Sequence, residues 1–205
     1  MLNSEILNIL EKKLNFSRDS INKLNVYVNM VLNANKSHNF ISKKTEADVW
    51  SRHILDSAQI VKYFDKSDKI FADLGAGAGF PGIVISIYGI RFKFHVKLYE
   101  KSPVKREFLS EVKKKLNLNL SIKEDVYKEN IIADVVCCRA FKKIDKVINI
   151  SREIVKKPHK LIVLKGKNAS AEIKKVSIPD NFSYKLFDSI TKKDSKIVIF
   201  KKKNE

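Results

Sequence analysis

The first third of the chain carries apolar residues at spacings of three and four. Over residues 5–14 and 20–33 this period places the apolar side chains on one face, which predicts two amphipathic helices. Ser17 or Asp19 is suited to cap the second helix, because a side-chain oxygen there accepts an otherwise unpaired backbone N–H.

A polar stretch over residues 33–44 then interrupts the pattern. After it, Thr45-Glu46-Ala47-Asp48 has the composition of a capped helix start, and we predict a third helix from there to about Phe64. Residues 1–66 are therefore expected to form a helical N-terminal cap.

From residue 70 onward, short runs of branched apolar residues alternate with helical periods. Strands are predicted at Ile70–Leu74, Phe94–Glu100, Leu120–Lys123, Asp134–Cys138, Leu161–Lys165 and Lys196–Lys201. Helices are predicted at residues 81–89, 103–116, 143–156 and 169–176. Strands that alternate with helices form a mainly parallel sheet with right-handed crossovers. We expect an α/β core over residues 67–205, with the helical cap packed on it in a single domain.

The composition argues against a membrane-spanning protein. Charged residues make up 31% of the chain, and no apolar run approaches the ~20 residues that a membrane helix needs. No secretory signal is visible at the N-terminus, so a cytoplasmic location is expected. Cys137 and Cys138 are neighbours in an apolar run, which predicts buried small side chains rather than a disulfide or a metal site.

The net charge of +18 is concentrated toward the C-terminus. Residues 156–205 hold fourteen lysines, no arginine and five acidic residues. This segment therefore carries half of the excess positive charge. A positive surface of this size attracts polyanions and releases their counterions, so it predicts a nucleic acid or an acidic membrane surface as partner. Because lysine far outnumbers arginine, a compositional bias of the genome is an alternative origin.

A glycine-rich turn follows the first predicted strand. Gly75, Gly77 and Gly79 alternate with small residues, and Pro81 suits the first turn of the next helix. Glycine permits positive φ and lets backbone N–H groups approach a ligand, so the turn can serve a phosphate, a dinucleotide or an S-adenosyl cofactor. A Walker loop ends in Gly-Lys-Ser/Thr, whereas here Phe80 follows the last of these glycines, which argues against a nucleoside triphosphatase.

The spacing of the glycines separates the two remaining cofactor classes. The dinucleotide fingerprint is Gly-x-Gly-x-x-Gly, but here every second residue is glycine and Asp73 precedes the first by two. Glu100 ends the second predicted strand, where a carboxylate can accept both ribose hydroxyls. Val126 and Tyr127 follow the third strand and can flank an adenine. The motif resembles that of class I S-adenosylmethionine methyltransferases, which implies that Asp73 and the turn backbone hold the methionine end of the cofactor.

Several segments together resemble one family. They are the Gly-Phe-Pro-Gly extension of the turn, Trp50-Ser51-Arg52-His53-Ile54-Leu55-Asp56-Ser57 before it, and Cys138-Arg139-Ala140-Phe141 and Leu164-Lys165-Gly166 after it. In this order they resemble the bacterial small-subunit ribosomal RNA guanine-N7 methyltransferases, also called glucose-inhibited division protein B. The resemblance covers nearly the whole chain.

The resemblance implies a class I, Rossmann-like methyltransferase fold with a helical N-terminal extension. It implies methyl transfer from S-adenosylmethionine to N7 of a specific guanine in 16S ribosomal RNA, in a cofactor pocket lined by Gly75, Phe80, Glu100, Val126, Tyr127 and Arg139. Guanine N7 carries an in-plane lone pair and needs no deprotonation, so neither a general base nor a metal is expected. Positioning of the reacting atoms should dominate catalysis, and their alignment can lower the barrier by roughly 7–11 kcal/mol at the upper end.

Arg139 is the preferred contact for the guanine or for the cofactor edge. It directly follows a predicted strand, at the carboxyl edge where such sheets bind ligands. A salt bridge to Asp56 or Glu100 is the structural alternative. Trp50 is expected to be packed in the core rather than stacked on a base.

Arg52, His53 and Lys165 are expected at the substrate RNA. For His53 an orienting role is favoured over acid–base catalysis, because the proposed reaction needs no proton shuttle. A lysine at position 165 can meet a phosphate, although a solvated surface lysine is the more common case.

Two other functions are weighed against the methyltransferase. A non-catalytic RNA-binding or ribosome-assembly factor that keeps the fold is disfavoured by the intact turn from Asp73 to Phe80. A dinucleotide-dependent oxidoreductase is disfavoured by the glycine spacing. The expected partner is 16S ribosomal RNA or the small ribosomal subunit, with no membrane and no metal, and a monomer suits a domain of this size.

Overall fold

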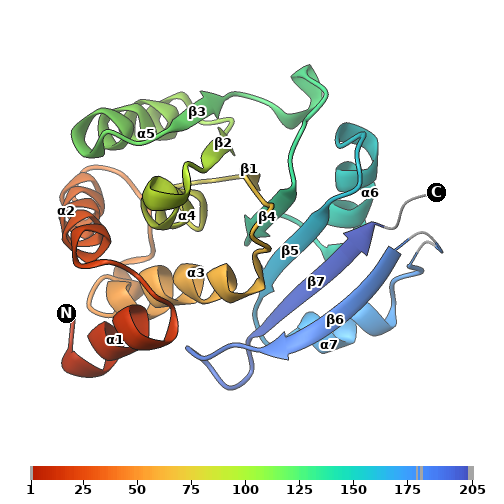
Figure 1. Cartoon of the computed structure of the whole chain (residues 1–205), viewed down its shortest axis with the longest axis horizontal. Coiled ribbons are helices and arrows are strands. Elements are labelled where there is room, and N and C mark those ends of the chain that lie inside the picture. Colours follow the sequence, from red (N-terminus) through yellow and green to blue (C-terminus); the bar gives the residue numbers. More distant parts are fainter. Residues whose placement is uncertain (1, 179, 181, 203–205) are drawn as a thin grey trace.

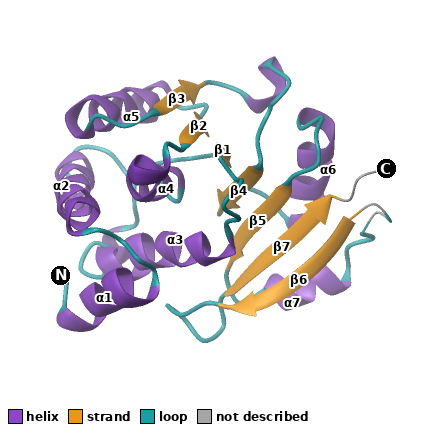
Figure 2. Cartoon of the chain, in the orientation of Figure 1, coloured by secondary structure: helices purple, strands orange, loops and turns teal. Residues whose placement is uncertain are grey.

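The computed structural model describes residues 2–178, 180 and 182–202, and within them helices joined by loops precede the first strand (Figure 2). The first helices are α1 (Ser4–Asn8), the π-helical turn η1 (Ile9–Lys13) and α2 (Arg18–Ala34). The Ser17 hydroxyl caps α2 by accepting the Ser20 backbone N–H at 3.1 Å. Of the two predicted caps, Ser17 is therefore the one used.

The third helical segment begins later than predicted. Residues Lys43–Thr45 form a single 3₁₀ turn, η2. The continuous segment consists of η3 (Trp50–Leu55), α3 (Asp56–Ala58) and η4 (Gln59–Tyr63). The prediction of a capped start at Thr45 was wrong, because the Thr45 hydroxyl donates to the Ser42 carbonyl oxygen at 2.8 Å and lies 2.9 Å from His53 Nε2.

Among the described residues, seven strands form one sheet in the order β3-β2-β1-β4-β5-β7-β6. They are β1 (Ile70–Leu74), β2 (His95–Tyr99), β3 (Leu120–Lys123), β4 (Val135–Arg139), β5 (Lys160–Lys165), β6 (Phe182–Asp188) and β7 (Lys196–Lys202). β1 to β5 pair in parallel, and β7 runs antiparallel to both β5 and β6. Six strands lie close to their predicted ranges, and β6 was not predicted.

Helices cover both faces of this sheet. The crossover helices are α4 (Gly82–Gly89), α5 (Pro103–Leu116), α6 (Ile144–Ile154) and α7 (Ala169–Lys174), all close to prediction. Figure 1 shows α2, α4 and α5 on one side of the sheet and α6 and α7 on the other. One apolar cluster joins the N-terminal helices, α4 and α5 to the sheet, and a second packs under α6 and α7. The predicted α/β architecture with a mainly parallel sheet is confirmed.

The predictions for three core residues are also confirmed. Cys137 and Cys138 are free, buried thiols in β4, and Trp50 is 4% exposed within the first cluster. No helix among residues 2–178, 180 and 182–202 is long and apolar enough to cross a membrane.

Candidate active site at the carboxyl edge of the sheet

The glycine turn after β1 adopts a backbone that requires its glycines. Gly75, Gly77 and Gly79 have φ values of +72°, +59° and +106°, in the left-handed region that disfavours side chains. At Gly75 a Cβ atom would lie 2.4 Å from Cδ2 of Phe141. The turn therefore combines positive φ with a close approach to an aromatic ring.

Helix α2, in the N-terminal part of the chain, packs against this turn through Tyr27. The buried Tyr27 hydroxyl donates to the Ala78 carbonyl oxygen at 2.7 Å, and the Tyr27 ring packs on Phe80 at a centroid distance of 5.2 Å. Burial raises the pKa of Tyr27 well above its usual value, so the hydroxyl remains a neutral donor. The helical cap is thus part of the framework of the site.

Glu100 follows β2 and faces the same turn. Its Oε2 accepts the Gly77 backbone N–H at 2.8 Å, and its Oε1 accepts the Ser102 backbone N–H at 2.8 Å. A carboxylate oxygen has more than one acceptor position, so Glu100 can still accept hydroxyl donors from a ligand.

These elements enclose a first pocket of about 510 Å³. Seven of the eight residues predicted for the cofactor line it, namely Gly75, Gly77, Phe80, Glu100, Val126, Tyr127 and Arg139. Val126 is buried, whereas Tyr127 is 53% exposed. Phe141 also lines this pocket and was not predicted.

Asp73 lies beneath the turn and outside the lining of the first pocket. It is fully buried. Its Oδ2 accepts the Gly82 backbone N–H at 2.8 Å, whereas Oδ1 has no hydrogen-bond partner within the described part of the chain. Burial raises the pKa of Asp73 to about 7, although the bond from Gly82 acts in the opposite direction. Asp73 thus fixes the start of α4, and its direct contact with a cofactor stays a prediction.

A second pocket of about 340 Å³ adjoins the first. It is lined by Arg52, His53 and Lys165, the three residues predicted to meet RNA. His53, Arg139 and Ala140 line both pockets. These three residues therefore form the boundary between a cavity at the glycine turn and a cavity with several cations.

Arg139 is held at this boundary by four neighbours. Its Nη2 donates to His53 Nδ1 at 2.7 Å, and its Nη1 donates to the Arg52 carbonyl oxygen at 3.0 Å. Nη1 also lies 3.5 Å from Asp56 Oδ2, and the guanidinium lies 5.2 Å from the centre of the Phe80 ring. The salt bridge to Asp56 that was the structural alternative is present, and Arg139 nevertheless faces both pockets.

His53 accepts from Arg139 and does not titrate near neutral pH. A guanidinium only donates hydrogen bonds, so Nδ1 is the acceptor and the ring proton is on Nε2. Nε2–H then donates to Thr45 Oγ1 at 2.9 Å. Burial, followed by the charges of Arg139 and Arg52, lowers the pKa of His53 to about 3. A neutral ring bonded on both sides supports an orienting role.

Lys165 lies in the second pocket with its charge already paired. Its Nζ is 2.8 Å from the Glu172 carboxylate and donates to the Lys142 carbonyl oxygen at 2.8 Å. Its side chain is only 14% exposed, so it is not a solvated surface lysine.

Sequence reasoning missed one wall of the second pocket. Thr191, Lys192 and Ser195 line it from the turn between β6 and β7, and Lys196 lines it from the start of β7. These residues come to the site because β7 adds antiparallel to β5, which a local sequence pattern does not reveal. Two neighbouring lysines between the last two strands were the only signal.

Comparison with known proteins identifies related sequences over most of the chain. A family model described as GidB, rRNA small subunit methyltransferase G, matches residues 20–198. The chain is 34% identical over 198 residues to the Ribosomal RNA small subunit methyltransferase G of Orientia tsutsugamushi (strain Ikeda), covering 96% of this chain and 98% of that protein. It is 38% identical over 183 residues to the protein of the same name in Rickettsia akari (strain Hartford), covering 89% and 94%.

Solved structures share the fold at low sequence identity. A methyltransferase from Pyrococcus furiosus superposes with a TM-score of 0.57 at 14% identity, covering 71% of this chain and 81% of that one. An RNA methyltransferase from Salinibacter ruber, in complex with S-adenosyl-L-homocysteine, gives a TM-score of 0.53 at 14% identity, covering 73% and 91%. These likenesses concern the fold alone, and they confirm the expected class I methyltransferase architecture.

Proposed function

The chain belongs to the GidB family, rRNA small subunit methyltransferase G, and we propose that it transfers a methyl group from S-adenosylmethionine to N7 of a guanine in 16S ribosomal RNA. The observation that carries this proposal is the pair of adjoining pockets that share Arg139 and His53. One pocket has the glycine turn and the carboxylate for an S-adenosyl group, and the other has the cations for RNA.

The residues of the first pocket fit S-adenosylmethionine. A volume of about 510 Å³ is ordinary for a cofactor site. In our proposal Glu100 accepts the ribose hydroxyls, Val126 and Tyr127 flank the adenine, and the backbone from Gly75 to Phe80 holds the methionine end. When bound, the cofactor supplies an electrophilic methyl group, whose transfer to the N7 lone pair returns the C–S electron pair to sulfur without a proton leaving guanine.

The protein's contribution is then positioning, and Arg139 is its central group. A guanidinium has five N–H donors, of which three are used by His53, Arg52 and Asp56, so two remain in the described structure. Guanine presents O6 beside N7 on its Hoogsteen edge. A donor from Arg139 to O6 leaves N7 free to face the first pocket. Since His53 and Asp56 hold the guanidinium, its direction is set before the RNA arrives.

The RNA side of the proposal follows from the charge. The net charge of +18 favours a polyanion, and cations from η3, β5 and the turn between β6 and β7 surround the second pocket. We propose the small ribosomal subunit as the partner, a cytoplasmic location, and a monomer as the acting species.

Methyl transfer to small subunits tests the proposed function. Purified protein is incubated with unmethylated small ribosomal subunits and methyl-labelled S-adenosylmethionine, and N7-methylguanine is located by reduction and aniline cleavage. We expect label at a single guanine of 16S RNA, and its loss in Arg139→Ala. Binding of S-adenosylmethionine without any transfer would favour an assembly factor, and the absence of binding would contradict the assignment of the first pocket.

A further inference from the structure

We propose that the turn between β6 and β7 forms, with η3, a binding site for the phosphate of the target nucleotide, in which Lys192 of the turn and Arg52 of η3 both hold the phosphate in the second pocket. The inference rests on the proposed function, because it requires an RNA substrate whose base reaches Arg139. It assigns a role to a segment that the motifs do not include.

The turn is fixed in place by a buried polar cluster. Gln59 of η4 is fully buried, and its Oε1 accepts the Ile190 backbone N–H at 2.9 Å. Its Nε2 donates to Ser189 Oγ at 2.9 Å and to Asp56 Oδ1 at 3.0 Å. The Thr191 hydroxyl donates to the same Asp56 oxygen at 2.9 Å. Because breaking buried hydrogen bonds leaves unpaired polar groups, the turn has a defined position beside the pocket.

The same carboxylate joins this turn to the boundary between the pockets. Oδ1 of Asp56 receives bonds from Gln59 and Thr191, while its Oδ2 faces Arg139 at 3.5 Å. Lys192 follows Thr191 directly in the chain. The position of Lys192 is therefore linked to that of Arg139 through a single side chain.

Two pocket cations are available for an anion. Three others are paired with carboxylates, namely Lys165 with Glu172, Lys196 with Asp188, and Arg139 with Asp56. Arg52 and Lys192 are exposed, and neither has a carboxylate partner among the described residues. Arg52 lies on η3 and Lys192 lies on the turn, so the two approach the pocket from different elements. Unpaired cations in a shared concavity favour a phosphate group.

The arrangement matches the parts of one nucleotide. Enzymes that modify a base take the nucleotide out of its stack into a pocket. The second pocket, at about 340 Å³, is large enough for a small ligand and is continuous with the boundary at Arg139. With the base at Arg139, the sugar and phosphate extend toward the unpaired cations, and the hydroxyl of Ser195 supplies a further donor.

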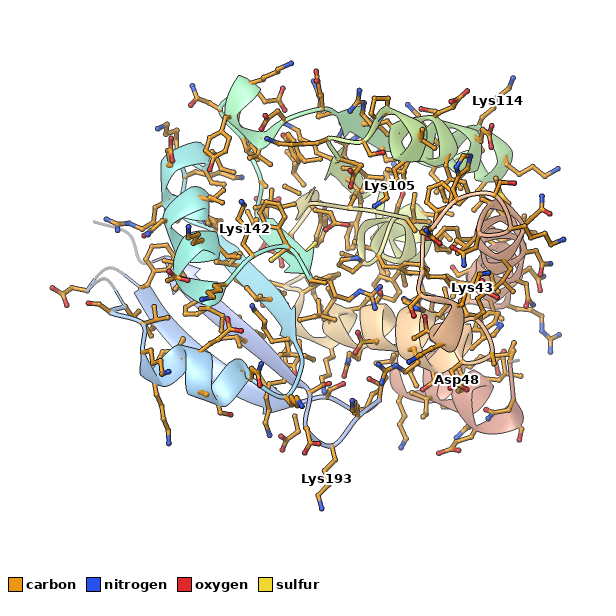
Figure 3. All side chains as sticks on the ribbon, turned by 180° about the vertical axis from the view of Figure 1, so that it is seen from behind. Lys43, Asp48, Lys105, Lys114, Lys142 and Lys193 are labelled. Carbon is orange, nitrogen blue, oxygen red and sulfur yellow. The ribbon has the colours of Figure 1, made fainter. Side chains whose placement is uncertain are left out.

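The chain offers a matched control for this site. Lys193 is the next residue of the same turn and is also exposed, but it does not line the pocket. Figure 3 shows Lys193 at the outer end of the turn, pointing away from the molecule. Lys192→Ala and Lys193→Ala therefore remove the same charge from neighbouring positions, one inside the proposed site and one outside it.

The test measures KM and kcat for methyl transfer to small subunits, the affinity for S-adenosylmethionine, and the salt dependence of subunit binding. We expect Lys192→Ala and Arg52→Ala to raise KM about tenfold, the scale of one charge-assisted contact, and to reduce the slope of log affinity against log salt by about 1. Lys193→Ala is expected to change KM less than about twofold, as for a charge without a phosphate contact. Cofactor affinity stays unchanged in all three.

Thr191→Val separates the position of the turn from its charge. It removes the bond to Asp56 and the contact of the Thr191 hydroxyl with Ser189 Oγ, and it keeps Lys192. Gln59 still anchors the turn, so we expect a raised KM with unchanged cofactor affinity, and an unfolding midpoint that falls slightly because a polar contact is lost. Equal effects of Lys192→Ala and Lys193→Ala would overturn the inference in favour of general surface charge. A loss of cofactor affinity in Lys192→Ala alone would overturn it as well. A wild-type protein that binds subunits without methylating them would contradict the proposed function instead, and the binding comparison of the two lysine variants would still decide the inference.

Discussion

At the boundary of the two pockets, the His53 ring accepts a hydrogen bond from Arg139 and donates one to Thr45. His53→Leu removes the acceptor for Arg139 and the donor to Thr45. We expect single-turnover methyl transfer to slow by about 10- to 100-fold, since small misplacements of an orienting group have effects of this size. His53→Asn keeps an acceptor and is expected to recover part of the rate. Equal losses in the two variants would argue that ring packing alone matters.

The low pKa of His53 gives a pH prediction. Its pKa of about 3 lies below the ordinary value near 6.5, so the folded protein binds fewer protons than the unfolded chain between these values. The stability contributed by this group is present above pH ~6.5 and is lost as pH falls toward 3. Methyl transfer should therefore show no inflection near 6.5 that depends on His53. An inflection that disappears in His53→Asn would contradict the neutral assignment.

Asp73 predicts the opposite pH dependence. Its pKa of about 7 lies above the ordinary value of about 4. Its contribution to the stability of the fold is therefore complete below pH ~4 and is lost as pH rises through 7. Asp73→Asn keeps an acceptor for the Gly82 N–H and cannot ionise. We expect the variant to gain on the order of 1–3 kcal/mol relative to wild type between pH 5 and 8, measured by urea unfolding. A difference independent of pH would show that Asp73 is not protonated in this range.

Two kinds of site residue differ in how far a sequence pattern determines their place. Residues at the carboxyl ends of strands, such as Glu100 after β2 and Arg139 at the end of β4, were predicted to lie at one edge, because parallel strands bring their carboxyl ends together. Asp73 lies inside β1, and its direction depends on how α4 packs on that strand. The motif alone fixes its place in the chain but not its orientation.

Among the elements, the glycine turn has the least tolerance for substitution. In Gly75→Ala the new Cβ meets Phe141 at 2.4 Å and occupies a backbone with φ of +72°. We expect S-adenosylmethionine affinity to fall by at least about tenfold, because steric strain of this kind amounts to about 1–3 kcal/mol. Isothermal titration measures the loss. Phe141→Ala in the same chain should relieve the contact but not the backbone strain, so only partial recovery is expected.

Two elements differed from their sequence predictions for physical reasons. The helix predicted from Thr45 starts at Trp50, because the Thr45 side chain is used at His53. β6 is an edge strand whose side chains are largely exposed and interspersed with polar residues, so its apolar pattern was too weak to identify. The first difference comes from a side-chain bond to His53, and the second from an edge strand that is held by its pairing with β7.

Across the whole molecule, the N-terminal helices and the glycine turn are joined through Tyr27 of α2. Tyr27→Phe removes the bond to the Ala78 carbonyl and keeps the ring packing on Phe80. We expect a loss of about 1–2 kcal/mol in the free energy of unfolding and a weaker affinity for S-adenosylmethionine. Trp50, the single tryptophan, lies in η3 and reports on the helical part. Its fluorescence and the far-ultraviolet signal should change together, and separate transitions would contradict a single folding unit.

The shared boundary at His53, Arg139 and Ala140 has a consequence for inhibition. A compound that tethers an adenosyl group to a guanine nucleotide would occupy both cavities at once. Its second half would bind at the high effective concentration set by the tether, so its affinity should exceed that of either half by roughly 10²- to 10⁴-fold. Selectivity would then come from the bridging segment, which must pass the Arg139 guanidinium that His53, Arg52, Asp56 and Phe80 already hold.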